Sequence, residues 1–215
     1  MNNFPDRKAM FSAAQRYCGN FDENWNRAGG VQYRICREAG LLAHHRILEI
    51  GCGSLSAGFI LMQFVEPMYY CGLDPNKWLI DAAIGNEDVE RIAARRAPRF
   101  AYNDQFDAAV FGERFDFIFA HSVLSHASRN ALRRFLDGCT AVAADQCTIV
   151  ASFRAGETNH ESGWIYPDHS HLAVEDIESE AAARGWVCAT RPEYTAMLVQ
   201  EVPTNIHDWV ELRRA

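Results

Sequence analysis

The chain has 215 residues, of which 48% are hydrophobic and 23% are charged. This balance is typical of a folded globular domain and excludes an intrinsically disordered chain, and at about 150 residues per domain the length predicts one main domain. The 21 lysines and arginines are outnumbered by 28 aspartates and glutamates, which gives a formal charge of −7. Because duplex-binding proteins need a basic face, we expect no nucleic-acid partner.

The cysteines and the apolar stretches exclude further classes. Seven cysteines occur without any C-x-x-C pair, so we expect neither a zinc knuckle nor a disulfide scaffold, but a reduced protein in the cytoplasm. The N-terminus has no apolar segment of the kind that forms a secretory signal. The longest apolar stretch, around residues 57–65, is far shorter than the roughly 20 residues that span a bilayer, so we expect no membrane partner. The oligomeric state stays open.

The chain divides into a short N-terminal segment and a long alternation of strands and helices. Residues 1–30 are polar and aromatic, end at the pair Gly29–Gly30, and are expected to form a lid or cap, while residues 31–215 form the main domain. Apolar periodicity and turn residues predict the elements of that domain. Helices are expected over about 31–42, 56–64, 77–95 with a loop at 85–86, 130–143 and 174–184, and strands over 47–50, 69–73, 99–102, 115–120, 147–153, 186–190 and 196–202.

Strands that alternate with helices at this spacing predict an α/β fold with a doubly wound, mostly parallel sheet and right-handed crossovers. The last two strands, joined by a short turn at Pro192–Glu193, predict an antiparallel hairpin at the C-terminal end. Ligands of such sheets bind beyond the carboxyl ends of the strands, where the strand order reverses. We therefore expect the functional residues in the segments that directly follow strands, namely 51–58, 74–77, 103–106, 121–126 and 154–171.

The turn after the first strand has the composition of a nucleotide-binding loop. Gly51 and Gly53 let the backbone turn tightly and approach a ligand closely, and the following helix directs its N–H groups to the same space. Asp74 comes 23 positions after Gly51, at the end of the second strand. An acid at that position can accept both ribose hydroxyls of a bound adenosine.

The spacing of the glycines disfavours a pyrophosphate ligand. A nicotinamide-binding fingerprint G-x-G-x-x-G would have its third glycine at Ser56, whereas the glycine comes only at Gly58. Glu49, two residues before Gly51, would repel a diphosphate but attract a cationic ligand that bears an ammonium group. A nicotinamide-dependent oxidoreductase stays as an alternative.

Three motifs follow one another in the chain: EIGCG at residues 49–53, GLDP at 72–75 and FDFIFAHSVLSH at 115–126. In this order they resemble the motifs of class I S-adenosylmethionine-dependent methyltransferases, within the broad group of bacterial small-molecule methyltransferases. The resemblance covers about residues 25–202 and implies a Rossmann-like methyltransferase domain. The chain departs from the group at Leu55, where many members have glycine.

The resemblance implies a role for each matching position in binding S-adenosylmethionine. Glu49, Gly51 and Gly53 would line the methionine part, and Cys52 between the two glycines would also contact the cofactor. Asp74, next to Pro75 and Asn76, would hold the ribose hydroxyls. Adenine contacts would come from Asn103, Asp104, Gln105 and Phe106 after the third strand, with Asp104 at the amino group and Asp107 close by. His121 would lie beside the methionine and the transferred methyl group, and Trp25 and Tyr33 could close over the cofactor.

The candidate catalytic residues are His121, His169 and Tyr166. Histidine titrates most readily near neutral pH, so His121 is a base, a contact to the acceptor, or a wall of the cofactor site, while His126 is interpreted as structural. The long polar loop after the fifth strand contains Trp164, Tyr166, His169 and His171. Loops of this length often bind ligands, although half of this one fits an ordinary surface loop. Its H-x-H spacing, with Asp168 or His160, would be a weak metal site, and no metal is expected.

The candidate substrate-binding residues are Trp25, Arg154, Trp164 and Tyr166. Arg154 ends the fifth strand, where a guanidinium would suit a carboxylate or phosphate of the acceptor, or else pair with Glu157 at the surface. The sequence thus predicts an S-adenosylmethionine-dependent methyltransferase that transfers a methyl group to oxygen or nitrogen of a small molecule. A catalytically silent protein that binds S-adenosylmethionine and serves a partner is the alternative from another class.

Overall fold

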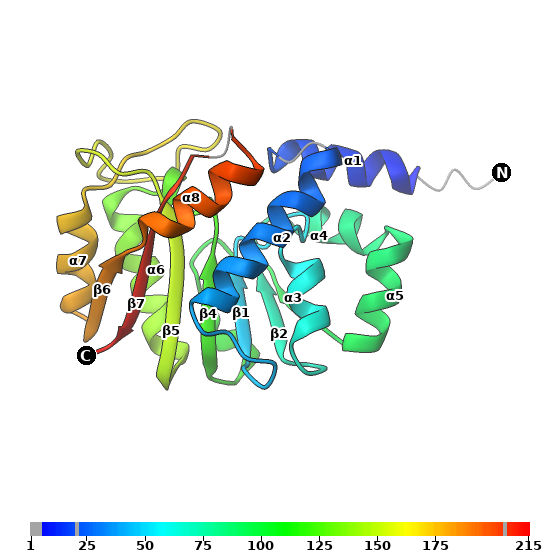
Figure 1. The fold of residues 1–215 in the computed structure, drawn as a ribbon, viewed down its shortest axis with the longest axis horizontal. Helices are drawn as coiled ribbons and strands as arrows, with labels where there is room; N and C mark the ends of the chain where they lie inside the picture. The colour runs from blue at the N-terminus through cyan, green and yellow to red at the C-terminus, as the bar shows by residue number, and fades with distance from the viewer. Residues whose placement is uncertain (1–5, 20–21, 204–205) are drawn as a thin grey trace.

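The structure is a computed structural model that describes residues 6–19, 22–203 and 206–215. A seven-stranded sheet forms its centre (Figure 1). In spatial order the strands are β3 (Arg99–Ala101), β2 (Tyr70–Leu73), β1 (Ile47–Ile50), β4 (Phe115–Ala120), β5 (Ala143–Phe153), β7 (Asp208–Arg214) and β6 (Trp186–Thr190). The first five pair in parallel, and β7 is antiparallel to both of its neighbours. The predicted doubly wound, mostly parallel α/β sheet with an antiparallel C-terminal end is therefore confirmed.

Helices cover both faces of this sheet (Figure 1). One face packs against α6 (Arg129–Val142) and α7 (Val174–Ala182), and the other against α2 (Asp22–Glu38), α3 (Gly58–Phe64), α5 (Glu87–Arg96) and α8 (Pro192–Glu201). At the edge of the second layer, α1 (Arg7–Tyr17) packs against α4 (Lys77–Ile84). Two short 3₁₀ helices, η1 (Ala109–Phe111) and η2 (Leu124–His126), flank β4.

The central strands are apolar on both faces because each face meets a helical layer. Within β1, Leu48 lies in the hydrophobic core beneath α6 and α7, whereas Ile47 lies in the core beneath α2 and α3. Leu48 is opposite Cys71 of β2 on one side and opposite Ile118 of β4 on the other. The chain moves outward from β1 to β2 and β3, then returns to form β4 and β5 on the other side, so the strand order reverses between β1 and β4. Ligand sites of doubly wound sheets lie at this reversal.

The C-terminal hairpin was predicted with wrong boundaries. Of the predicted strand 196–202, residues 196–201 belong to helix α8 and Val202 caps it, and the strand that pairs with β6 is β7, near the C-terminus. Pro192 lies in the first turn of α8, where its fixed φ favours a helix and its missing N–H costs nothing. Tyr194 and Leu198, four positions apart, are the buried residues of this helix. A short apolar run does not by itself distinguish a strand from a helix, and this one is helical.

Helix α2 also differs from the prediction, because it begins at Asp22 and continues through Gly29–Gly30. A Cβ atom on Gly29 would lie 2.1 Å from the carbonyl oxygen of Ser56, whereas one on Gly30 would meet nothing within 4 Å. Gly29 is therefore a point of close contact between α2 and the turn that follows β1. Residues 1–5 and 20–21 of the predicted lid lie outside the described ranges, and the division into a lid and a main domain stays a prediction.

Candidate active site

A cavity with a volume of about 760 Å³ lies beyond the carboxyl ends of β1, β2, β4 and β5. It brings together residues that the sequence analysis selected from separate parts of the chain. These are Glu49, Gly51, Cys52, Gly53, Asp74, Pro75, Asn103, Asp104, Gln105, His121, Arg154, Trp164, Tyr166 and His169. Trp25 and Tyr33 are not among its lining residues.

The turn after β1 is built around Asp74. Gly51 has a φ of +73° and donates its N–H to the carbonyl oxygen of Leu73, with a distance of 2.7 Å. One carboxylate oxygen of Asp74 accepts from the N–H of Gly53 at 2.9 Å, and the other accepts from that of Asn76 at 2.8 Å. Leu55 has a φ of +61°, in the left-handed region that favours glycine. This conformation is the physical reason why glycine fits that position well.

Glu49 is a buried acid at the floor of the cavity. It lies at the middle of β1 and is only 4% exposed, and the hydroxyl of Tyr70 donates to its Oε2. Burial raises the pKa of Glu49 to about 8, with a further increase from the charge of Asp74, although the hydrogen bond from Tyr70 acts in the opposite direction. Without a cation beside it, this carboxyl therefore stays protonated at neutral pH.

The segment after β3 is organised by Asn103. Its side-chain oxygen accepts from the backbone N–H of Gln105 and of Asp107, and its amide donates to the carbonyl of Asp107. Asp104 lines the cavity, where the amide of Gln105 donates to it at 2.7 Å. Asp107 is not a lining residue, since its carboxylate accepts from the N–H of Ala109. Asp104 is thus the acid of this loop that lines the cavity.

His121 follows β4 and lies across the strand reversal from Gly51. Its ring is stacked on Trp209, with 5.4 Å between ring centroids, and lies 5.0 Å from the ring of His207. Burial lowers the pKa of His121 to about 4, so the ring is neutral at neutral pH. The amide Nε2 of Gln32 lies 3.1 Å from Nδ1, and a donating amide leaves the ring proton on Nε2. That buried Nε2 has no hydrogen-bond partner among the described residues.

His126 has the opposite protonation pattern. Its Nδ1 lies 2.7 Å from the carbonyl oxygen of Asp168, and because a carbonyl only accepts, Nδ1 must carry the proton. The lone pair of the neutral ring is then on Nε2. Burial lowers the pKa of His126, while the hydrogen bond to Asp168 raises it. His126 also lines the cavity, and its ring centroid lies 4.8 Å from that of His169 and 5.0 Å from that of Tyr166.

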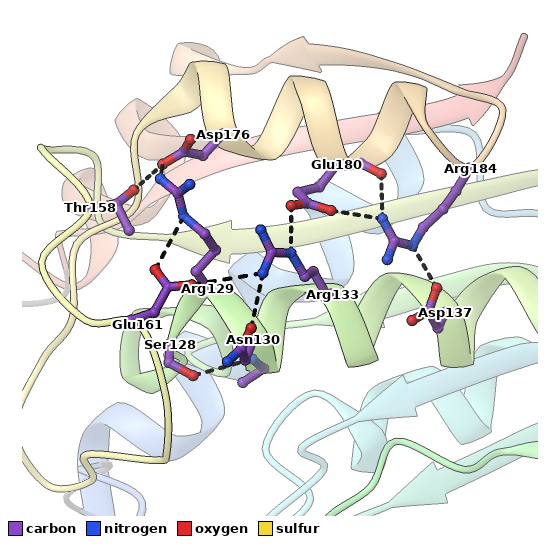
Figure 2. A network of polar contacts seen from close by, with 11 residues as sticks. Ser128, Arg129, Asn130, Arg133, Asp137, Thr158, Glu161, Asp176, Glu180 and Arg184 are labelled. Atoms are coloured by element: carbon purple, nitrogen blue, oxygen red, sulfur yellow. Dashed lines mark hydrogen bonds and ion pairs between the residues drawn. The ribbon is translucent and has the colours of Figure 1, made fainter.

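Polar contacts anchor the first part of the loop between β5 and α7 to both helices (Figure 2). Asp176 of α7 accepts from Arg129 of α6 and from Thr158 of the loop. The backbone at the start of α6 adds to this anchor, since the N–H of Arg129 donates to the carbonyl oxygen of His160 and that of Asn130 to the carbonyl oxygen of Glu161. Further along, the N–H of Ile165 donates to the carbonyl of His126, and Ser170 donates to backbone carbonyls of the η2 segment. These contacts hold the aromatic part of the loop over the cavity.

Helix α1 closes the same side of the cavity. Tyr17 at its end lies 5.3 Å from Trp78 of α4 and 5.2 Å from Tyr166 of the loop, measured between ring centroids. The hydroxyl of Tyr166 donates to the backbone carbonyl of Tyr17. Burial raises the pKa of Tyr166, so its phenol stays protonated. The N-terminal helix and the loop therefore form one continuous aromatic wall.

Two predicted contacts to bound molecules do not lie at the cavity. Trp25 is buried between Phe11 and Phe59, and its indole N–H donates to the carbonyl of Ser54. Tyr33 packs against Phe64. Both side chains face inward because they lie on the side of α2 that covers the sheet, so Trp25 supports the turn after β1 from behind instead of contacting a substrate. In the described ranges, no three His, Cys, Asp or Glu residues come together as a possible metal site.

Comparison with known proteins relates the chain to methyltransferases. Residues 48–149 match a family model described as a methyltransferase domain. No curated protein sequence matches the chain. Across the ranges that the structure describes, no helix is both long and apolar enough to cross a membrane.

Solved structures of methyltransferases share the whole fold. One is magnesium protoporphyrin IX methyltransferase from Synechocystis PCC 6803 with bound SAH (S-adenosylhomocysteine), with 15% identity and a TM-score of 0.65 over 97% of this chain and 100% of that one. Another is an S-adenosylmethionine-dependent methyltransferase from Clostridium acetobutylicum ATCC 824, with 11% identity and a TM-score of 0.66 over 97% and 98%. The glycopeptide N-methyltransferase MtfA has 12% identity and a TM-score of 0.64 over 87% and 90%. The chain therefore has the fold of class I S-adenosylmethionine-dependent methyltransferases, as the sequence predicts, and its residues 48–149 match the model of a methyltransferase domain.

Proposed function

We propose that the protein is an enzyme that uses S-adenosylmethionine to methylate an oxygen or nitrogen atom of a small molecule. The observation that carries this proposal is the single cavity, which joins the glycine turn and Asp74 to a second group of histidines and aromatic residues. Its volume of about 760 Å³ is in the range of cavities that enclose small ligands. The two groups would hold the cofactor and the acceptor side by side.

The residues at the β1 and β2 end fit S-adenosylmethionine. Asp74 keeps lone pairs beyond its two backbone contacts, so it would accept the ribose hydroxyls. Glu49 would lose its proton and hold the ammonium group of the methionine part. The backbone of Gly51, Cys52 and Gly53 would lie along that part of the cofactor. Asp104 would accept from the adenine amino group, with Asn103 and Gln105 shaping that end and Pro75 beside the ribose.

S-adenosylmethionine supplies a methyl group on a cationic sulfur, and its transfer forms a bond to the acceptor oxygen or nitrogen, breaks the methyl–sulfur bond, leaves SAH and releases one proton from the acceptor. The protein mainly holds the acceptor in line, since orientation alone contributes up to about 7–11 kcal/mol. His121 would donate its Nε2 proton to a bound molecule beside the methyl group. Trp164 and Tyr166 would form the acceptor wall, with His169 as a further contact.

His126 is the best candidate for the base that receives this proton. Its Nδ1 proton is directed to Asp168, which leaves Nε2 with the lone pair. A positioned base contributes roughly 10²–10⁴-fold to the rate. The sequence analysis gave His126 only a structural role, because nothing in the local sequence shows that the distant Asp168 carbonyl fixes the ring.

The test of the function has two steps. Calorimetry with SAH and with NAD tests the cofactor, and binding of SAH alone is expected. Labelled S-adenosylmethionine is then offered with phenols, amines and carboxylic acids, and a methylated product is located on oxygen or nitrogen by NMR. Binding without transfer to any acceptor would favour the catalytically silent partner protein, whereas binding of NAD alone would favour the oxidoreductase.

The assignment of the base has its own test. His126→Asn is expected to lower kcat by about 10²-fold with SAH affinity unchanged, because asparagine can keep the contact to Asp168 but takes up no proton. His121→Asn is the matched variant and should mainly raise KM. Equal losses of kcat in both variants would contradict these separate roles.

Since seven cysteines are unpaired in the structure, we also propose that the enzyme works in the cytoplasm, where thiols stay reduced.

A further inference from the structure

Arg154 is a cation without a counter-charge at the acceptor end of the cavity. It follows β5 directly and lines the cavity together with His121, Trp164 and Tyr166. Among the residues that the structure describes, its buried Nε has no hydrogen-bond partner, and no acidic side chain, Glu157 included, forms an ion pair with it. A donor left unpaired in this way costs stability unless a ligand accepts from it.

The acids of the cavity lie at its other end. Glu49, Asp74 and Asp104 are the acidic lining residues among those described, and they follow or belong to β1, β2 and β3. These strands lie on one side of the strand reversal, whereas β5 lies on the other. Asp208, which comes close in the neighbouring strand β7, uses its carboxylate to accept from the N–H of Ala155. The charge of Arg154 is therefore not compensated by the residues that would hold the cofactor.

Three histidines near Arg154 do not add positive charge. Burial lowers the pKa of His126, His169 and His207, and the guanidinium of Arg154 lowers each of them further. The rings are therefore neutral at neutral pH, and they can donate to or accept from a ligand that approaches Arg154. Arg16 and Arg134 also line the cavity, but Arg154 is the cation whose charge acts on these three neutral rings. A guanidinium beside neutral polar rings suits one anionic group.

The wall beside Arg154 is aromatic and exposed to the cavity. Trp164 is 50% exposed, Tyr17 is 41% and Tyr166 is 36%, although each has a large apolar ring. The loop contacts shown in Figure 2 fix this wall in place. Exposed rings at a cavity typically pack against a flat apolar ligand.

We propose that Arg154 binds a carboxylate of the methyl acceptor, and that the acceptor is a small aromatic acid methylated at a different oxygen or nitrogen. This inference rests on the proposed methyltransferase function and adds the substrate class. The planar guanidinium matches both oxygens of a carboxylate, and the ring of the acid would lie against Trp164 and Tyr166. The carboxylate would fix the acceptor at one end while its hydroxyl or amine faces the methyl group.

The test compares acids with amides of the same shape. Hydroxybenzoic and aminobenzoic acids and their carboxamides are titrated into the SAH-loaded protein and assayed with labelled S-adenosylmethionine. The native chain should prefer the acids by about tenfold or more in binding, as expected for one charge-assisted contact. Arg154→Gln should abolish this preference, and Arg154→Lys should keep part of it. Arg91→Gln, an equal loss of charge on the exposed face of α5, should behave as the native chain.

Each other outcome overturns the inference. Acids that bind no better than amides in the native chain, or a preference that survives Arg154→Gln, would exclude the contact. A methyl ester as the product would show that the carboxylate is the methylated group and not the anchor. Weaker SAH binding in both folded Arg154 variants would assign Arg154 to the methionine carboxylate. Since SAH binding is measured first, its absence in the native chain would refute the proposed function itself, a result distinct from a missing acid preference.

Discussion

The two ends of the cavity are built in different ways. The end beyond β1 and β2 depends on two short turns, in which the backbone N–H groups of Gly53, after β1, and of Asn76, after β2, donate to the carboxylate of Asp74. The end beyond β4 and β5 is assembled from α1, η2, the loop before α7 and the segment before β7, which are distant in the chain. The first end can hold the same cofactor in many proteins, whereas the second can change its acceptor by changing loop residues without disturbing the turns.

The largest effect is expected where α2 touches the turn after β1. Gly29→Ala places a Cβ atom 2.1 Å from the carbonyl oxygen of Ser56, and two backbones cannot separate without loss of packing. The free energy of unfolding should fall by about 3 kcal/mol. Gly30→Ala, with nothing within 4 Å, should be neutral or stabilising by about 0.5–1 kcal/mol. Urea unfolding of both variants measures the difference, and equal stabilities would contradict the close contact.

The next largest effect is expected for a substitution of Asp74, which should weaken cofactor binding without changing the acceptor end of the cavity. Asp74→Asn removes the charge that would accept the ribose hydroxyls, so the Kd for SAH should rise by about tenfold to a hundredfold. Asp88→Asn removes an equal charge from the exposed first turn of α5 and should leave the Kd unchanged. Calorimetry gives both constants. An unchanged Kd for the Asp74 variant would refute its role.

The pH dependence of binding tests Glu49. Its pKa is raised to about 8 in the free protein, and a ligand ammonium favours the charged form, so binding of SAH should release a proton. Affinity should therefore rise with pH between 6 and 8, by up to about tenfold per unit. Glu49→Gln has no proton to release and should bind more weakly, with no such slope. Calorimetry in buffers of different ionisation enthalpy counts the proton, and a flat profile in the native chain would contradict the prediction.

The smallest effect is expected at the anchor of the acceptor loop. Asp176→Asn weakens the contacts to Arg129 and Thr158, which are partly exposed, so the free energy of unfolding should fall by about 1 kcal/mol or less. Amide exchange should increase in residues 154–173, and KM for the acceptor should rise a few-fold while the Kd for SAH stays constant. Asp145→Asn, an exposed change at the start of β5, is the control. A change in SAH affinity would show that the two ends are coupled.

The reach of sequence reasoning follows the same division. The glycine turn and Asp74 were predicted because their geometry depends on neighbouring residues, and strand ends are visible in the apolar pattern. The role now proposed for His126 was not predicted, because its tautomer depends on the carbonyl of Asp168, 42 positions away. Trp25 was placed at the substrate although it is buried, since an aromatic residue on a helix does not reveal which side faces the core.

The sequence alone determined the alternation of strands and helices, the reversal of strand order that creates the cavity, and the acid and glycines of the cofactor turn. These depend on periodicity and on backbone conformations that each residue favours locally. Only the tertiary structure decided that residues 196–201 are helical, that Tyr70 donates a hydrogen bond to the buried Glu49, and that Arg154 lies among neutral histidines without an ion pair to a described acid. Such properties depend on burial and on partners from distant segments, and these exist only once the sheet and its helices have packed together.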